Sequence, residues 1–119
     1  MPSVAVIGAS QARTKYGNRA VRAYLRQGWK VYPVNPNVAE VEGLRTYARV
    51  TDIPDPIDRA ALYVPAEIGV AVLDGVKQKG IKELFVNPGA ESDELLARAE
   101  QLGLDPIQAC AIVDIGERP

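Results

Sequence analysis

Short apolar runs alternate with segments of helical periodicity along this chain. The apolar runs predict four buried strands, over residues 3–7, 30–34, 59–64 and 83–86. Two segments between them repeat apolar residues at helical spacing, over residues 18–27 and 67–78. A third helix is predicted after Ser92, which can act as its N-cap, with Gly103 at its end. Strands that alternate with helices predict a parallel sheet in an α/β fold.

The apolar stripes of the two longer helices indicate which side chains face the sheet. The residues that we expect to be buried there are Val21, Tyr24 and Leu25 in the first helix and Ile68, Val72 and Val76 in the second. Weaker patterns predict a short strand over 44–47, a short helix or turn over 50–53 and an edge strand over 106–108. We expect one doubly wound domain over residues 1–119, with five to six strands, helices on both faces and a loose tail at 114–119.

The carboxyl ends of the predicted strands form the expected ligand site. In a doubly wound sheet, ligands bind in the crevice beyond these ends. The segments that meet there are Gly8-Ala9-Ser10, Asn35-Pro36-Asn37, Val64-Pro65 and Asn87-Pro88-Gly89. Three of the four contain proline, which cannot continue a central strand, and none of them contains an acidic residue. Proline beside a flat amide makes a rigid, shallow wall that suits an adenine or an extended thin chain.

Composition excludes several kinds of catalytic and metal site. The chain has 119 residues, no histidine and one cysteine, Cys110. Histidine-based nucleophile activation, most zinc sites and an intrachain disulfide are therefore excluded. The three carboxylates Glu91, Asp93 and Glu94 have the positions of helix-start charges and not of an acid–base pair. The amino-terminal residues lack the pattern of a signal peptide, so we expect a cytoplasmic protein that does not bind membranes.

The charges are distributed unevenly along the chain. Residues 1–39 contain six Lys or Arg and no Asp or Glu, although the net charge of the whole chain is −1. A glycine turn that leads from a strand into a helix presents backbone N–H groups and the positive end of the helix dipole. Among the cations around this turn, Arg13, Lys15 and Arg19 are the ones placed to touch a ligand, whereas Arg22 and Arg26 have the spacing of a solvated helix face. The pattern predicts a site for phosphate groups.

The spacing of this turn does not fit the common nucleotide motifs. A GxGxxG motif that began at Gly8 would need glycine where the chain has Ser10 and Arg13. The second strand is followed by Asn35 where dinucleotide-binding proteins usually carry an acidic residue for the ribose. The Gly-Lys-Ser/Thr sequence of a P-loop is absent. What remains is a longer turn with Arg13 and Lys15, which can wrap a diphosphate or reach a separate monophosphate.

The chain resembles the small CoA-binding proteins, whose domain is similar to the CoA-binding domain of the succinyl-CoA synthetase α subunit. The resemblance covers residues up to about Cys110 in the right order. The matching segments are Ile7-Gly8-Ala9-Ser10, Lys15-Tyr16-Gly17-Asn18, Tyr32-Pro33-Val34-Asn35-Pro36, Gly43-Leu44, Val64-Pro65 and Asn87-Pro88-Gly89-Ala90-Glu91. One departure is the residue after Cys110, which is Ala111 where members of the family often have proline.

The resemblance implies a Rossmann-like domain that binds coenzyme A or an acyl-CoA without catalysing a reaction. By this analogy, the glycine turn and the basic segment hold the phosphates, the second and third strand ends flank the adenosine, and the fourth lies along the pantetheine. The predicted binding residues are Gly8, Ala9, Ser10, Arg13, Lys15, Tyr16, Gly17, Asn18, Arg19, Asn35, Pro36, Val64, Pro65, Asn87, Pro88 and Gly89. We expect no metal ion and no nucleic acid partner.

Two other functions stay open at this point. The first is a nucleotide-dependent enzyme, of NAD or acyl-transfer type, whose catalytic groups the sequence does not identify. The second is a regulatory or interaction subunit in which ligand binding is weak or lost. The preferred acyl group, the role of Cys110 and the oligomeric state are also open, and a homodimer agrees with base rates for soluble proteins.

Overall fold

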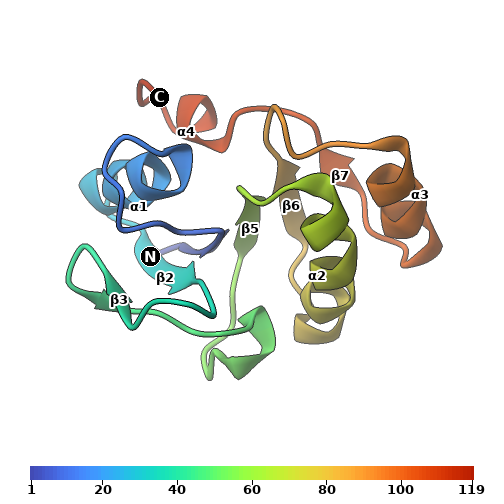
Figure 1. Cartoon of the computed structure of the whole chain (residues 1–119), viewed down its shortest axis with the longest axis horizontal. Coiled ribbons are helices and arrows are strands. Elements are labelled where there is room, and N and C mark those ends of the chain that lie inside the picture. Colours follow the sequence, from blue (N-terminus) through green and yellow to red (C-terminus); the bar gives the residue numbers. More distant parts are fainter.

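A five-stranded parallel sheet forms the centre of the computed structural model, which describes residues 1–119 (Figure 1). The strand order is β2-β1-β5-β6-β7, and every neighbouring pair is parallel. The strands are β1 (Ser3–Ile7), β2 (Lys30–Val34), β5 (Arg59–Leu62), β6 (Glu83–Val86) and β7 (Pro106–Ile107). The order reverses between β1 and β5, so the switch point of this doubly wound sheet lies between these two strands.

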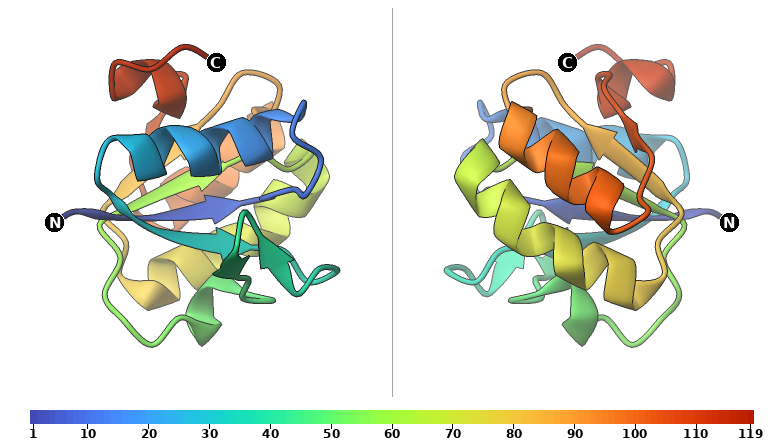
Figure 2. Two further views of the ribbon diagram at one scale, coloured as in Figure 1. Left: turned by 90° about the vertical axis from the view of Figure 1, so that its left-hand side faces the viewer. Right: turned by 90° about the vertical axis from the view of Figure 1, so that its right-hand side faces the viewer.

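Helices cover both faces of the sheet (Figure 2). The helices α1 (Tyr16–Arg26) and α4 (Ala111–Asp114) pack on one face, with Val4, Val6 and Phe85. The helices α2 (Ala66–Lys79) and α3 (Asp93–Gln101) pack on the other, with Ala5 and Ile7. Alternate residues of one strand thus enter two separate cores, which explains why β1 is apolar at every position. None of the four helices is long and apolar enough to cross a membrane.

A small antiparallel hairpin extends from the β2 edge. It consists of β3 (Glu40–Val41) and β4 (Leu44–Arg45), and it is followed by the short 3-10 helix η1 (Val50–Asp52). An isolated bridge between Val34 and Tyr47 joins the segment after the hairpin to the end of β2. The predicted strand over 44–47 is therefore shorter than expected, because its last residues pair with β2 only at Tyr47.

The predicted inner faces of two helices need correction. Val21 and Tyr24 lie on the buried face of α1, whereas Leu25 lies beside this face and is exposed. In α2 the buried stripe is Gly69, Leu73 and Val76, so Ile68 lies at the side of the helix and is exposed. Several other elements begin or end one or two residues from the predicted position; for example, α1 begins at Tyr16 instead of residue 18, and β5 ends at Leu62 instead of residue 64.

The segment after β7 is tied to the rest of the fold, whereas the sequence predicts a loose tail. The Ala111 carbonyl accepts a hydrogen bond from the Tyr24 hydroxyl at 3.0 Å. Asp114 pairs with Arg59 at 2.8 Å, and Glu117 pairs with Arg26 at 2.8 Å. Helix α4 and the residues after it therefore lie beside α1, as both views of Figure 2 show. These partners are 55 or more residues away, so no local pattern announces them.

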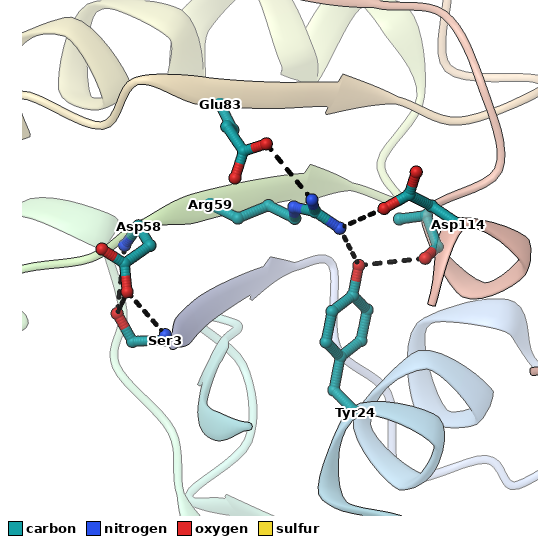
Figure 3. Close-up of polar contacts among 7 residues, drawn as sticks. Ser3, Tyr24, Asp58, Arg59, Glu83 and Asp114 are labelled. Carbon is teal, nitrogen blue, oxygen red and sulfur yellow. Dashed lines mark hydrogen bonds and ion pairs between the residues drawn. The ribbon is translucent and has the colours of Figure 1, made fainter. Parts of the chain in front are cut away.

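Arg59 stands at the centre of this attachment (Figure 3). Its guanidinium donates to the Tyr24 hydroxyl at 3.2 Å and forms ion pairs with Asp114 and, at 3.2 Å, with Glu83. The same guanidinium lies over the ring of Phe85, 4.4 Å from its centroid. Burial alone lowers the pKa of the Arg59 guanidinium, but the hydrogen bonds to Tyr24, Glu83 and Asp114 outweigh burial and raise it. Arg59 is therefore a charged residue that connects β5, β6, α1 and α4.

Candidate functional site

A cavity of about 980 Å³ opens at the carboxyl edge of the sheet. Its residues come from the turns after β1, β2, β5 and β6, from the start of α1 and from the C-terminal segment. We call it the ligand cavity; it is lined by Gly8, Ala9, Ser10, Thr14, Lys15, Tyr16, Gly17, Asn35, Leu62, Tyr63, Val64, Pro65, Asn87, Pro88, Gly89, Ala90, Cys110, Val113 and Pro119. Its position is the one at which doubly wound folds bind ligands.

Two glycines allow the loop after β1 to pack closely on the amino-terminal end of α1. Gly8 has a φ of +94°, and a Cβ there would come within 2.6 Å of the Tyr63 carbonyl oxygen. A Cβ at Gly17, in the first turn of α1, would collide with the carbonyl oxygen of Gly8. Only glycine fits at either position, because in both the obstacle is backbone. The close approach brings the first turn of α1 to the floor of the ligand cavity.

The amino terminus of α1 differs from those of the other helices at this edge. The first turn of α2 carries Glu67, and the first turn of α3 carries Asp93 and Glu94, which also has the Ser92 hydroxyl as its cap. The first turn of α1 has no acidic residue, and its N-cap residue Lys15 makes no side-chain capping hydrogen bond. The first N–H groups of a helix have no acceptor within the helix. This end of α1 therefore presents uncapped donors and a lysine to the cavity, which is the arrangement that binds anions.

The asparagine side chains at this edge mainly hold the turns together. The amide of Asn35 donates to the Ala9 carbonyl at 2.8 Å and accepts from the Asn37 N–H at 2.7 Å. The amide of Asn87 donates to the Leu62 carbonyl and accepts from the Ala111 N–H, both at 2.8 Å. Each of these amides therefore shapes the cavity by fixing two backbone segments.

The basic turn of residues 10–18 is held by a network of polar side chains. Asn18 is fully buried, and its amide donates to the Ser10 carbonyl at 2.9 Å and to the Glu42 carboxylate at 3.0 Å. The Arg22 side chain donates to the Asn18 amide oxygen at 2.8 Å and to the Arg13 carbonyl at 2.7 Å. Arg22 is thus a positioning residue for the turn, whereas its spacing alone predicts a solvated helix face.

Glu42 reaches this network from the β3–β4 turn. Its carboxylate also lies 3.5 Å from the Arg13 guanidinium, and its backbone has a φ of +50°. That conformation is uncommon for a residue with a side chain, and the glycine at position 43 has a positive φ as well. No local pattern in the sequence indicates Glu42, because its contacts lie 24 or more residues away in the chain.

Glu42→Ala is expected to loosen the basic turn. The variant removes one charge-assisted hydrogen bond and one partly exposed ion pair, so the free energy of unfolding should fall by about 1 kcal/mol. Amide hydrogen exchange in residues 10–18 should become faster. Glu40→Ala is the matched control, because the Glu40 side chain is exposed and makes neither contact. Equal exchange rates in the two variants would show that Glu42 does not hold the turn.

Three residues that the sequence did not indicate, Tyr63, Cys110 and Val113, also line the cavity, and we call them the apolar wall. The Tyr63 hydroxyl is buried without a hydrogen-bond partner, and burial raises the pKa of this phenol. Val113 is more than half exposed although it is apolar. The proline-free Cys110-Ala111 junction thus still places its cysteine at the cavity.

The structure brings most of the predicted binding residues to the ligand cavity. Those that line it are Gly8, Ala9, Ser10, Lys15, Tyr16, Gly17, Asn35, Val64, Pro65, Asn87, Pro88 and Gly89. Four others do not: Arg13, Asn18, Arg19 and Pro36. Arg13 turns to Glu42, Asn18 is buried beneath the turn, and the Arg19 guanidinium lies over the Tyr16 ring, 5.3 Å from its centroid. The binding role of every residue in the set stays a prediction.

Comparison with known proteins relates this site to a described family. A family model described as "CoA binding domain" matches residues 2–116. The chain is 42% identical over 94 residues to an ADP-forming acetate–CoA ligase II of Archaeoglobus fulgidus, which covers 77% of this chain and 14% of the ligase. It is 40% identical over 86 residues to the α subunit of an ADP-forming acetate–CoA ligase I of Pyrococcus furiosus, covering 67% of this chain and 19% of that subunit. The chain thus spans less than a fifth of the length of these relatives.

Solved structures show the same fold both alone and within a larger chain. A conserved hypothetical protein of Pyrococcus furiosus superposes with a TM-score of 0.87 at 35% identity, covering 96% of this chain and 99% of that one. An acetyl-coenzyme A synthetase 1 of Candidatus Korarchaeum cryptofilum, solved with phosphate and ADP, superposes with a TM-score of 0.78 at 34% identity, covering 90% of this chain and 25% of that one.

Proposed function

Because the chain belongs to the family of CoA-binding domains, we propose that it binds coenzyme A or an acyl-CoA in the ligand cavity and catalyses no reaction of its own. The observation that carries this proposal is the acid-free, uncapped first turn of α1, which opens into the cavity beside Lys15. A diphosphate is an anion of the kind that such a helix end binds. The chain offers this feature at α1, while α2 and α3 carry acidic first turns.

The rest of the cavity suits the remainder of a CoA molecule. The apolar wall of Tyr63, Cys110 and Val113 suits the methyl and methylene groups of a thin, extended arm. We therefore place the diphosphate at Gly8–Ser10 and the first turn of α1, and the adenosine between Asn35 and Pro65. The pantetheine arm runs past Pro88 and Gly89 toward Cys110. In this orientation, an acyl group on the thiol lies beside the side chains of Tyr63, Cys110 and Val113.

Calorimetric titration of the purified chain tests the proposal most directly. We expect CoA or acetyl-CoA to bind more tightly than NAD or ATP, because neither of the latter has a pantetheine arm for the apolar wall. Native mass spectrometry of freshly purified protein should show whether a CoA species is retained. Tighter binding of NAD than of CoA would overturn the proposal. The absence of any CoA-dependent thermal shift at millimolar ligand would favour a subunit that has lost binding.

The relatives of the chain are ligases, but we propose that this chain supplies binding and not synthesis. It spans 14% of the Archaeoglobus fulgidus ligase, and it offers no histidine in any role. Incubation with acetate, ATP and CoA should therefore leave the CoA unconsumed. Formation of acetyl-CoA by the isolated chain, lost on Cys110→Ser, would identify an enzyme instead.

Lys15→Gln is expected to weaken CoA binding about fivefold, which corresponds to one exposed charge contact with a phosphate. The difference in affinity between the wild type and the variant should shrink as the salt concentration rises, because salt screens the attraction between Lys15 and the phosphate in the wild type. Arg13→Gln is the matched control: it removes the same charge two residues away, but Arg13 lies outside the cavity and pairs with Glu42. If the two variants lose affinity equally, the lysine acts only through the overall charge of the turn.

A further inference from the structure

A second, smaller cavity lies along α1 and is lined almost entirely by arginine. Its volume is about 210 Å³, and its lining consists of Arg19, Arg22, Arg26, Arg118 and Pro119. The first three are spaced by three and four residues, so they follow one face of the helix. The C-terminal segment, which lies beside α1, brings in the other two. We call this the arginine cavity.

The positive charges of the arginine cavity are only partly compensated within the chain. Arg26 pairs with Glu117 at 2.8 Å. The Arg22 guanidinium donates from Nε to the Asn18 side-chain oxygen and from one terminal nitrogen to the Arg13 backbone carbonyl, and both acceptors are neutral. Arg19 lies over the Tyr16 ring, and Arg118 forms no ion pair. Four guanidinium groups thus line one small space, and the only side-chain carboxylate paired with them is that of Glu117. The remaining positive charge favours the binding of an anion.

We propose that the arginine cavity binds a phosphoryl group. The planar guanidinium presents N–H donors in a fork that matches phosphate oxygens, and several forks around one small space suit a compact dianion. The volume of about 210 Å³ admits such a group and excludes a whole nucleotide cofactor, which fits the ligand cavity of about 980 Å³. The lining contains no hydrophobic residue other than Pro119, so an apolar ligand gains nothing there.

The phosphoryl group has two chemical sources. Pro119 lines both cavities, and Arg19 lies over Tyr16, which lines the ligand cavity. The first source is therefore the ribose 3′-phosphate of a CoA bound next door, and this source rests on the proposed function. The second source is a free phosphate ion, which is independent of that function. Both sources require the same arginines. They differ in whether the phosphoryl group is attached to CoA or is a free ion.

The test compares CoA with dephospho-CoA, which lacks only the 3′-phosphate. The variant is Arg26→Gln/Arg118→Gln, and the control is Arg45→Gln/Arg49→Gln, which also removes two exposed arginines and one exposed ion pair, Arg49–Asp52. If the 3′-phosphate enters the arginine cavity, the wild type and the control should prefer CoA by about tenfold. The variant should lose this preference and still bind dephospho-CoA as the wild type does.

Titration with inorganic phosphate tests the second source. Phosphate is added to protein saturated with dephospho-CoA, and the Nε–Hε signals of the arginines are followed by NMR, with chloride at equal ionic strength as reference. Saturable shifts in the wild type that are absent from the variant would support a free phosphate ion. Equal binding of CoA and dephospho-CoA together with no phosphate-specific shift would overturn the inference. If neither CoA nor dephospho-CoA binds, the proposed function fails, while the phosphate titration on the free protein still tests the arginine cavity.

Discussion

Gly17→Ala should weaken CoA binding about a hundredfold, the equivalent of two charge-assisted hydrogen bonds. The added methyl group would collide with the carbonyl oxygen of Gly8, and neither partner in this contact is a flexible side chain. The first turn of α1 must therefore move away from the glycine turn. Its uncapped N–H groups then no longer converge on the place where we put the diphosphate. Isothermal titration calorimetry with CoA measures this loss.

Gly75→Ala is the matched control for that variant. Gly75 is also helical, but a Cβ there would meet only the side chains of Val50 and Thr51, at 3.2 Å and 3.5 Å. Alanine is a better helix former than glycine, so this variant should fold and bind CoA like the wild type. Native affinity in the Gly17→Ala protein would show that close packing of α1 on the glycine turn is not needed for binding.

Arg59→Met should lower the free energy of unfolding by about 3 kcal/mol. Arg59 is buried, with only 7% of its surface exposed. Its removal leaves the carboxylates of Asp114 and Glu83 without their ion pair and the Tyr24 hydroxyl oxygen without its donor. Methionine keeps much of the packing against Phe85, so the loss reports mainly the polar contacts. Urea unfolding followed by circular dichroism measures the change.

Arg98→Met provides the comparison for Arg59→Met. Arg98 pairs with Asp74 at 2.6 Å, a shorter contact than any that Arg59 makes, but its side chain is 37% exposed. An ion pair on the surface contributes less than about 1 kcal/mol, so this variant should unfold almost like the wild type. Similar losses in both variants would mean that burial does not set the contribution of Arg59.

The elements of this fold are predictable from sequence where burial is complete. The strands over 3–7, 30–34 and 83–86 appear with the predicted bounds, because their largely apolar runs stop at Gly8, Asn35-Pro36 and Asn87-Pro88. The inner faces of the helices are less predictable. Leu25 and Ile68 each lie one position from a buried residue, and periodicity alone does not decide between neighbours on the edge of a stripe.

The residues of the candidate site likewise fall into a predictable and an unpredictable group. Its turn residues are predictable because glycine and proline mark the carboxyl ends of strands locally, and Gly8, Pro65 and Pro88 all line the cavity. The residues that support or complete the site were not predicted. Glu42 and Val113 act from segments far along the chain, and their positions follow from tertiary packing that leaves no local pattern.

The attachment of the C-terminal segment has a consequence for the order of folding. Its contacts with α1 join residues 87 to 91 positions apart, so they close the longest loops in the chain. Contacts of such high sequence separation form late, because the entropy of loop closure opposes them until the intervening sheet exists. We therefore expect the sheet edge with the glycine turn to form before the wall that contains Cys110 and Val113. A ligand that spans both parts would then stabilise the last step of folding, and its affinity would include the free energy of docking that segment.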